Sequence, residues 1–290
     1  MSGHGYDFHK SIADNPPVCY NSGRTGIVSR TAGTGSLSCT GGRKEWLKMD
    51  AKYTTQQMIL TSRCDASGKL GYADCFALFM DIATEHAEKL GIGLTVLGKE
   101  NKFWLTVKTK IRFLRRPRLT ETVEVATWPE QPEGTRCNRD YTLTRGDEIL
   151  ALGKTQWALM NLATGKLENA ESVYPPELEI PGETAIPEPF ERIDEDFPEP
   201  PFGTYTVRST DIDVGGHMNN VSYVRALLGL FSAEQWKSFR PGSIEVHYKS
   251  PCLEGDVLDF RKRQQGDTLY LKAETGGKTV LLAALCRAQV

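Results

Sequence analysis

The run DIDVGGHMNNVSY, from Asp211 to Tyr223, sets a carboxylate and an imidazole four residues apart across two glycines. Adjacent glycines permit a tight turn and a close approach by a ligand, and Asn is favoured at the start of a helix. The run therefore predicts a strand end, a turn and a helix start, with Asp213 and His217 beside that start. Free N–H groups and the positive dipole end of a helix suit a developing oxyanion. For an isolated pair, a capping Asp and an ordinary polar His would be the simpler interpretation.

Composition limits the classes of protein to consider. A chain of 290 residues suits two domains, and a net charge of −2 gives no sign of nucleic-acid binding. No run approaches the roughly 18 apolar residues of a membrane span. Seven scattered cysteines without a C-x-x-C pair favour free thiols in a reducing compartment. The five histidines lack metal-ligand spacing, so we expect neither a metal nor another cofactor.

Two segments differ from the rest of the chain. Residues 1–48 are rich in Gly, Ser and Thr with little hydrophobic periodicity, which predicts a disordered leader. No acidic residue occurs between Val18 and Lys44, as in transit peptides. The expected location is the cytoplasm, or the plastid stroma if this leader targets the chain there. Residues 176–202 combine closely spaced prolines with acidic residues, which predicts a semi-extended linker laid over the surface.

The remaining ranges, 49–175 and 203–290, repeat each other. DASGK from Asp65 aligns with DVGGH from Asp213, and a helical apolar pattern and an alternating strand follow each. Both strands run into a proline, and apolar residues follow at equal spacing: Pro117, Leu119 and Val123 in the first copy, Pro251, Leu253 and Val257 in the second. A repeat of this length is a duplicated domain. Each copy predicts an α+β domain in which an antiparallel sheet wraps around one helix.

Over about residues 52–288 the chain resembles the acyl-ACP thioesterases, which have two tandem hotdog domains. The motifs that carry the resemblance are D-x-D-x-x-G-H-x-N-N-x-x-Y from Asp211, Y-x-x-x-C ending at Cys252, R-x-D-x-x-G from Arg63, and the strands with Trp104 and Trp128. The resemblance implies hydrolysis of fatty acyl-ACP to free fatty acid and holo-ACP, a step of fatty acid biosynthesis. It also implies that the first domain holds the acyl chain and the second is catalytic.

Two positions depart from the plant members of that family. Gly215 stands where they carry Asn, and Pro251 where they carry Glu, whereas Asp213 and His217 match. The local pattern is also similar to single-domain acyl-CoA thioesterases, in which one Asp carries the chemistry. An acyl-CoA thioesterase is therefore the first alternative, and a catalytically silent acyl- or carrier-binding module is the second. In the first copy Lys69 replaces the His.

The predicted site comprises Asp213, His217, Asn219, Asn220, Gly216 and Cys252. Asp213 is expected to act as general base or nucleophile, with His217 in support. The two asparagines, at a helix start whose N–H groups face an oxyanion, suit capping better than orienting water. Cys252 is expected to be structural, because a lone Cys is usually a small buried hydrophobe.

Two further sets of residues are assigned to substrate and carrier. The expected liners of the acyl pocket are Phe76, Phe79, Met80 and Trp104. The run Lys102–Thr120 is basic, and its alternation places Lys108, Lys110 and Arg112 on one exposed strand face. Such a face is often merely solvated, but it also suits the acidic acyl carrier protein. The expected docking residues are Arg112, Arg115, Arg116 and Arg118. A monomer and a homodimer are both compatible with a chain that already holds two domains.

Overall fold

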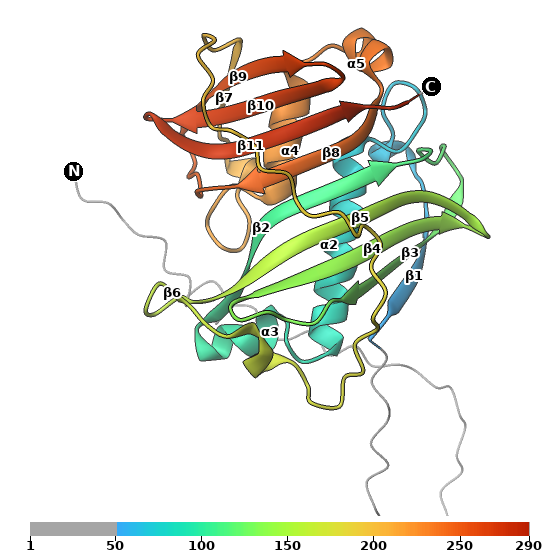
Figure 1. Cartoon of the computed structure of the whole chain (residues 1–290), viewed down its shortest axis with the longest axis vertical. Helices are drawn as coiled ribbons and strands as arrows, with labels where there is room; N and C mark the ends of the chain where they lie inside the picture. The colour runs from blue at the N-terminus through green and yellow to red at the C-terminus, as the bar shows by residue number, and fades with distance from the viewer. Residues whose placement is uncertain (1–50, 290) are drawn as a thin grey trace, which may run out of the picture. The chain divides into compact units, whose positions relative to one another are not determined.

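Two main helices, one in each copy, lie against the same face of one antiparallel sheet (Figure 1). The computed structural model describes residues 51–289, so the leader predicted for residues 1–48 lies outside the described residues. The first copy contains β1 (Tyr53–Met58), η1 (Thr61–Arg63), α2 (Tyr72–Lys89), α3 (Leu94–Leu97), η2 (Gly98–Glu100), β2 (Lys102–Phe113), β3 (Thr122–Pro129), β4 (Arg136–Arg145), β5 (Glu148–Asn161), β6 (Lys166–Leu167) and η3 (Ala170–Val173). The second contains β7 (Gly203–Thr206), η4 (Ser209–Asp211), α4 (Asn220–Gly229), α5 (Ala233–Phe239), β8 (Pro241–Tyr248), β9 (Val257–Gln265), β10 (Thr268–Thr275) and β11 (Lys278–Arg287).

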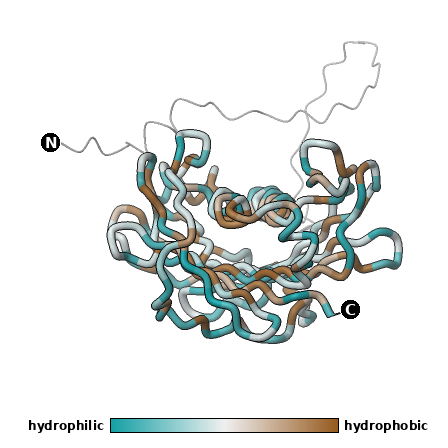
Figure 2. The backbone as a smooth tube through the Cα atoms, turned by 90° about the horizontal axis from the view of Figure 1, so that it is seen from above, coloured by the Kyte–Doolittle hydropathy of each residue, from teal (hydrophilic) through white to brown (hydrophobic). Residues whose placement is uncertain are grey.

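The sheet runs continuously through both copies. Its strand order is β1-β3-β4-β5-β2-β8-β11-β10-β9-β7, and β6 pairs with β5. The two copies join where β2 pairs antiparallel with β8, so that Lys108 lies opposite His247 and Ile111 opposite Ile244. Seen from above, the sheet curves around the helices (Figure 2). The predicted α+β arrangement, a sheet wrapped around a helix in each copy, is confirmed.

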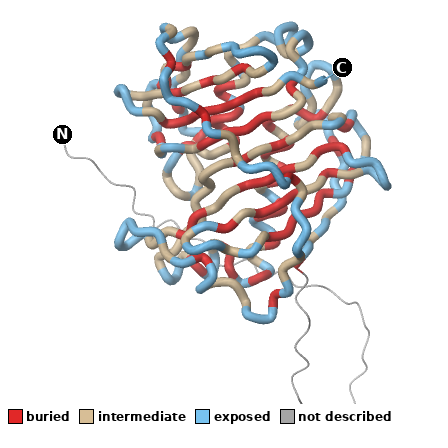
Figure 3. The backbone as a smooth tube through the Cα atoms, viewed as in Figure 1, coloured by how far each residue is buried: buried red, intermediate tan, exposed pale blue. Residues whose placement is uncertain are grey.

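The core lies between the helices and the concave face of the sheet. Helix α2 buries Phe76 and Phe79, and α4 buries Val224 and Leu227, in each case at the three- or four-residue spacing that places side chains on one face. Buried residues also follow the central strands (Figure 3). Burial of these apolar side chains is the main favourable term that holds helix to sheet.

The register of the repeat differs by one residue from the predicted pairing of the prolines. Leu70 N–H donates to the Pro117 carbonyl (2.8 Å), and at the equivalent helix entry Met218 N–H donates to the Cys252 carbonyl (2.9 Å). Cys252 therefore takes the place of Pro117. The strands agree: Leu258 is buried as Val123 is, whereas Val257 is 49% exposed. The register of the strand is set by the burial of every second residue. Equal spacing after a proline does not set it.

The range predicted as a linker crosses the convex face of the sheet. Between η3 and β7 the described chain forms no helix or strand. Lys154 Nζ donates to the Ile186 carbonyl (2.9 Å), and Ile193 and Phe197 pack on Leu282 and Ala284. The linker thus spans the joint between the copies on the side opposite the helices (Figure 1).

This crossing covers the strand face that was expected to be exposed. Lys110 pairs with Glu245 of β8 (2.9 Å) and donates to the Pro189 carbonyl (3.2 Å). Arg112 pairs with Glu188 (2.9 Å). The prediction of an exposed basic face is wrong for Lys110, which Glu245 and the linker partly bury. The Arg112 side chain stays 41% exposed, and the acidic linker neutralises its charge.

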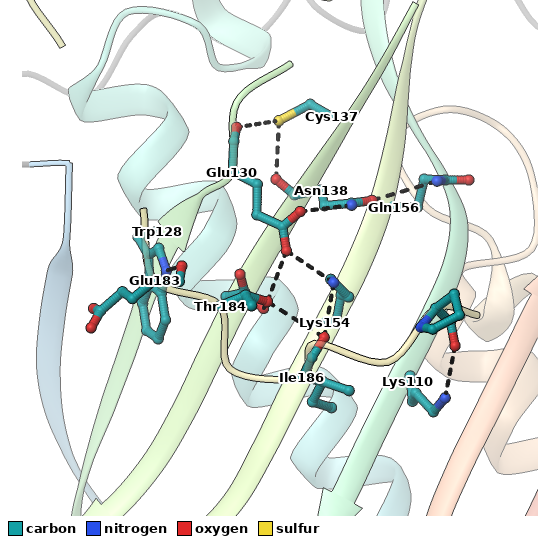
Figure 4. Close-up of polar contacts among 12 residues, drawn as sticks. Lys110, Trp128, Glu130, Cys137, Asn138, Lys154, Gln156, Glu183, Thr184 and Ile186 are labelled. Carbon is teal, nitrogen blue, oxygen red and sulfur yellow. Dashed lines mark hydrogen bonds and ion pairs between the residues drawn. The ribbon is translucent and has the colours of Figure 1, made fainter. Parts of the chain in front are cut away.

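A polar cluster fastens the linker to the first copy (Figure 4). Glu130 Oε1 accepts hydrogen bonds from Lys154 Nζ and from the Thr184 hydroxyl, both at 3.0 Å. Asp140, fully buried, lies beside them, with Thr184 Oγ1 at 3.4 Å. Burial raises the pKa of Asp140 to about 7, and the charge of Glu130 adds to the shift. Burial also opposes ionisation of Glu130, but hydrogen bonds from Asn138 and Lys154 prevail and lower its pKa.

The raised pKa of Asp140 predicts a pH-dependent stability. A carboxyl whose pKa is higher in the folded state binds more protons there than in the unfolded chain, so stability falls as pH rises from about 4 to 7. Asp140→Asn removes this titration. Between pH 5 and 8 we expect the wild type to lose at least about 1 kcal/mol more unfolding free energy than Asp140→Asn. Denaturant unfolding at both pH values measures it, with exposed Asp147→Asn as control; equal pH slopes for wild type and Asp140→Asn would contradict the prediction.

Candidate active site

The turn that carries Asp213 and His217 is closed by backbone bonds. Asp213 N–H donates to the His217 carbonyl (2.9 Å), and Gly216 N–H donates to the Asp213 carbonyl (3.0 Å). Gly216 has φ +75°, a conformation that disfavours residues with a Cβ. The backbone thus holds the turn between η4 and α4, and the two side chains are free for other contacts.

The carboxylate and the imidazole border the same small space. Asp213 Oδ1 accepts the Gly215 N–H at 2.8 Å. A Cβ on Gly215 would lie 3.0 Å from that oxygen and 3.9 Å from His217 Nδ1. Asp213 is half-buried and His217 exposed. The structure therefore places both side chains on one turn, on either side of Gly215, and a side chain at 215 would crowd the Asp213 carboxylate.

Asn219 caps the helix that follows. Its Oδ1 accepts Val221 N–H (2.8 Å), and its own N–H donates to the Asp211 carbonyl (2.7 Å). Asn220 is the first helical residue, and its carbonyl accepts the Tyr248 hydroxyl (3.3 Å). Among the described residues the Asn220 N–H has no hydrogen-bond partner. This N–H at the helix start therefore remains available to an oxyanion.

Asp211 supports the site in a way that the sequence reasoning missed. Its buried carboxylate accepts the Tyr205 hydroxyl and the Arg208 N–H, each at 2.8 Å, and its carbonyl holds Asn219. Asp211 therefore ties strand β7 to the helix start. The one available signal was its place two residues before Asp213 in the same motif.

The first copy has the same turn but a different environment for its carboxylate. Asp65 Oδ1 accepts both the N–H (2.8 Å) and the hydroxyl (2.6 Å) of Ser67. The Arg116 guanidinium pairs with Asp65 Oδ2 and donates to the Leu70 carbonyl (2.9 Å). Burial opposes ionisation of Asp65, but the hydrogen bonds from Ser67 and Arg116 prevail and lower its pKa. With Lys69 in the place of the His, this exposed carboxylate is neutralised by Arg116.

The two family departures lie where the first copy binds its carboxylate. Since Cys252 takes the place of Pro117, Pro251 takes that of Arg116, and Gly215 takes that of Ser67. The second copy thus keeps the backbone contact, from Gly215 N–H, but lacks equivalents of the Ser67 hydroxyl and the Arg116 guanidinium. No ion pair among the described residues involves Asp213. Its carboxylate therefore keeps lone pairs that can accept a proton from water.

Cys252 lies close to the turn but is suited to a structural role. It is fully buried, and burial raises the pKa of its thiol, which disfavours the nucleophilic thiolate. Its carbonyl anchors Met218 at the helix entry.

The expected liners of the acyl pocket fall into two clusters. Phe76 and Phe79 are buried under α2, where Phe79 stacks on Tyr141 (ring centroids 4.8 Å apart) and Met80 packs at the margin. Trp104 belongs to a separate cluster near the end of α2, and its indole N–H donates to the Ile92 carbonyl (2.9 Å). The structure does not bring Trp104 to the Phe76 cluster.

The expected docking arginines are largely engaged within the chain. Arg115 pairs with Glu121 (2.9 Å) and Glu148 (2.7 Å). Arg112 and Arg116 have the partners described above. Arg118 is exposed and takes part in no ion pair among the described residues.

Residues 51–289 lack two features of other functional classes. No group of three or more His, Cys, Asp or Glu side chains has the arrangement of a metal site there. No described helix is long and apolar enough to cross a membrane.

Comparison with known families agrees with the duplicated fold. Residues 50–174 match the family model of the acyl-ACP thioesterase N-terminal domain, and residues 195–281 match that of the C-terminal domain. The fold is similar to an acyl-ACP thioesterase from Bacteroides thetaiotaomicron (TM-score 0.72, 22% identity, 82% of this chain and 98% of that one). It is also similar to a 12:0-ACP thioesterase from Umbellularia californica (TM-score 0.69, 20% identity, 82% and 97%).

Curated relatives have low sequence identity. The chain is 24% identical to the chloroplastic acyl-acyl-carrier-protein hydrolase FATB3 of Cuphea viscosissima, over 70% of this chain and 55% of the relative. It is 25% identical to the chloroplastic oleoyl-acyl carrier protein thioesterase 1 of Arabidopsis thaliana, over 70% and 62%. The chain spans somewhat more than half the length of these relatives.

The capping contact of Asn219 predicts unequal effects at the two asparagines. Asn219→Ala removes the acceptor for Val221 N–H and should cost about 1 kcal/mol of unfolding free energy. Asn220→Ala keeps its backbone and should change stability by less than about half of that. Thermal and denaturant unfolding of both variants tests this; equal losses at the two positions would show that Asn219 is not the cap that matters.

Proposed function

Because the chain belongs to the acyl-ACP thioesterase family, we propose that it hydrolyses fatty acyl-ACP thioesters to free fatty acid and holo-ACP, and so ends acyl chain elongation. The observation that carries the proposal is the contrast between the two copies. Asp65 is bound by the Ser67 hydroxyl and by Arg116, whereas Asp213 has neither contact and accepts the Gly215 N–H, with His217 on the same turn. A carboxylate kept available beside an imidazole and a helix start suits hydrolysis.

The proposed mechanism uses three groups, which are the Asn220 N–H, the Asp213 carboxylate and the His217 imidazole. The thioester oxygen accepts the Asn220 N–H at the start of α4, where the helix dipole also favours negative charge. Asp213 takes a proton from the water that adds to the thioester carbon, or attacks that carbon itself. When the C–S bond breaks, His217 supplies the proton for the leaving thiolate. The acyl chain fills the apolar side of the site and excludes water, which strengthens these electrostatic contacts.

Replacing the carboxylate tests this assignment. Asp213→Asn keeps the shape of the side chain but cannot accept the proton, so kcat should fall by about 10²–10⁴-fold. Asp65→Asn is the matched control: it changes the equivalent residue of the first copy and should keep kcat within about threefold of wild type. Thiol release is measured on a panel of acyl-ACPs and matching acyl-CoAs.

The same panel separates the alternatives. Equal rates on acyl-CoA and acyl-ACP would favour the acyl-CoA thioesterase. The departures at Gly215 and Pro251 are the reason for considering that alternative. Binding of acyl-ACP without turnover would favour the silent binding module. A wild-type rate in Asp213→Asn would refute the assignment of the carboxylate.

We also propose that the carrier protein docks on the basic segment 102–120 at its exposed end. Arg118 is the exposed arginine of the four predicted, and a β-bridge places Lys69 beside it. The carboxylate partners of Arg112, Arg115 and Arg116 give those residues structural roles as well. Two neighbouring cations suit an acidic carrier and would steer its approach.

Charge reversal at Arg118 tests the docking proposal. Arg118→Glu should raise KM for acyl-ACP at least about threefold at low salt and leave KM for acyl-CoA unchanged. Lys99→Glu, an exposed cation of η2, is the control. An unchanged KM for acyl-ACP in Arg118→Glu at low salt would refute docking at this end.

The cellular location is proposed from the sequence and from the names of the relatives. We place the enzyme in the cytoplasm, or in the plastid stroma if residues 1–48 act as a transit peptide, as the names of the chloroplastic relatives suggest. Fractionation of cells that express the full chain with a C-terminal tag distinguishes the two. Sedimentation velocity distinguishes a monomer from a homodimer.

A further inference from the structure

The two copies differ in how far the main helix extends over the sheet. Both helices start at equivalent points, after Gly71 and Asn219, but α2 has 18 residues and α4 has 10. The additional turns of α2 bury His86, which lies 2.9 Å from Arg139 Nη1 of β4. Arg139 Nη1 in turn lies 3.3 Å from the Thr127 hydroxyl of β3. In the first copy, helix and polar side chains thus cover the concave face of these strands.

The second copy leaves the equivalent region hollow. Helix α4 ends at Gly229, and α5 follows at an angle, with the Trp236 indole N–H donating to the Leu228 carbonyl (2.9 Å). By strand register, Leu269 takes the place of Arg139 and Lys262 that of Thr127. A cavity of about 480 Å³ lies between α5 and strands β9 and β10; we call it the α5 pocket.

The α5 pocket has an apolar, largely aromatic wall, and the other five of its nine lining residues are polar or charged, among them Gln235 and Gln264. Phe231 and Trp236 lie with ring centroids 4.8 Å apart, Phe239 lies 6.2 Å from Trp236, and Leu269 adds an aliphatic side chain. Ligand sites of about 300–1,000 Å³ with apolar walls and few polar groups are typical of small-molecule pockets. The α5 pocket therefore has the size for an elongated ligand, and its aromatic wall suits an apolar group.

The polar groups of the α5 pocket favour an anion. Its charged lining residues are Lys262, Arg263 and Glu199, which sum to one positive charge. Arg263 is engaged, since it donates to the Asp196 carbonyl (2.8 Å) and stacks on Phe197. Lys262 Nζ lies 4.7 Å from the Phe202 ring centroid, and no ion pair among the described residues involves it. A carboxylate at Lys262 would gain a charge-assisted hydrogen bond next to the aromatic wall.

We propose that the α5 pocket binds a free long-chain carboxylate, with its tail among Phe231, Trp236 and Phe239 and its head group at Lys262. The choice of ligand rests on the proposed function, because a free fatty acid is the product class of that reaction. The pocket adjoins the C-terminal end of α4, whereas Asp213 and His217 lie at its N-terminal end. The second copy then holds a product-binding site separate from the place where the product forms.

Quenching by 12-bromododecanoate tests the proposal on the full chain. Bromine quenches a tryptophan that it touches, so binding should reduce the fluorescence of Trp236, and Trp236→Phe should remove most of this quenching. Lys262→Glu should weaken the binding of 12-bromododecanoate by about tenfold, and Lys262→Arg should restore it. Thiol release from acyl-ACP should stay at the wild-type rate in both Lys262 variants.

The controls separate this proposal from the proposed reaction. Asp213→Asn should bind 12-bromododecanoate as the wild type does, so loss of turnover on every thioester would refute the reaction and leave the binding result intact. Quenching that persists in Trp236→Phe, together with an unchanged Kd in Lys262→Glu, would place the carboxylate elsewhere and overturn the α5 pocket. Absence of any quenching in the wild type would overturn it as well.

Discussion

The antiparallel pairing of β2 with β8 is the contact on which the rest of the structure depends. It turns two half-sheets into one surface, with Lys110 opposite Glu245 and Ile111 opposite Ile244. On the concave side, it brings the main helices together, and Arg225 of α4 pairs with Asp74 of α2 (3.0 Å). On the convex side, the charged residues of the same strands lie beneath the linker. A buried ion pair such as Lys110–Glu245 specifies the arrangement more than it stabilises it, because desolvation offsets much of the attraction.

After duplication, the two copies use equivalent carboxylates differently. Asp213 of the second copy is available for chemistry, and Asp65 of the first copy makes structural contacts. The backbone bonds of the two turns are the same, which shows that the geometry of the turn does not require a reactive site. The difference lies in a few side chains: Ser67 and Arg116 around Asp65, and Gly215 and Pro251 near Asp213. The residues that depart from the plant pattern are thus the ones that leave Asp213 without a side-chain partner at these two positions.

Local patterns predicted the elements well, and long-range packing explains where they failed. The Asp-His turn, the helix after it and the alternating strands follow from spacing within about a dozen residues, so the duplicated fold and the placement of Asp213 and His217 on one turn before a helix could be predicted. The burial of Lys110 depends on Pro189, far away in the chain, and no local pattern contains that contact. The one-residue error at Pro251 arose because a proline was used to align strands whose register is set by Leu258 facing the core. The support from Asp211 depends on Tyr205 and Arg208, which only the folded chain places around it.

The lengths of the strands at the joint and at the margins of the sheet have a consequence for solubility. The outermost strands, β1 and β7, have only six and four residues, whereas β2 and β8 have twelve and eight. A separated copy would expose one of these longer strands as an open edge with unpaired N–H and C=O groups, which is the usual template for aggregation. Within the intact chain the pairing of β2 with β8 covers part of both long strands, and the strands at the two ends of the strand order are short. The tandem arrangement therefore protects the protein from edge-to-edge association as well as building its site.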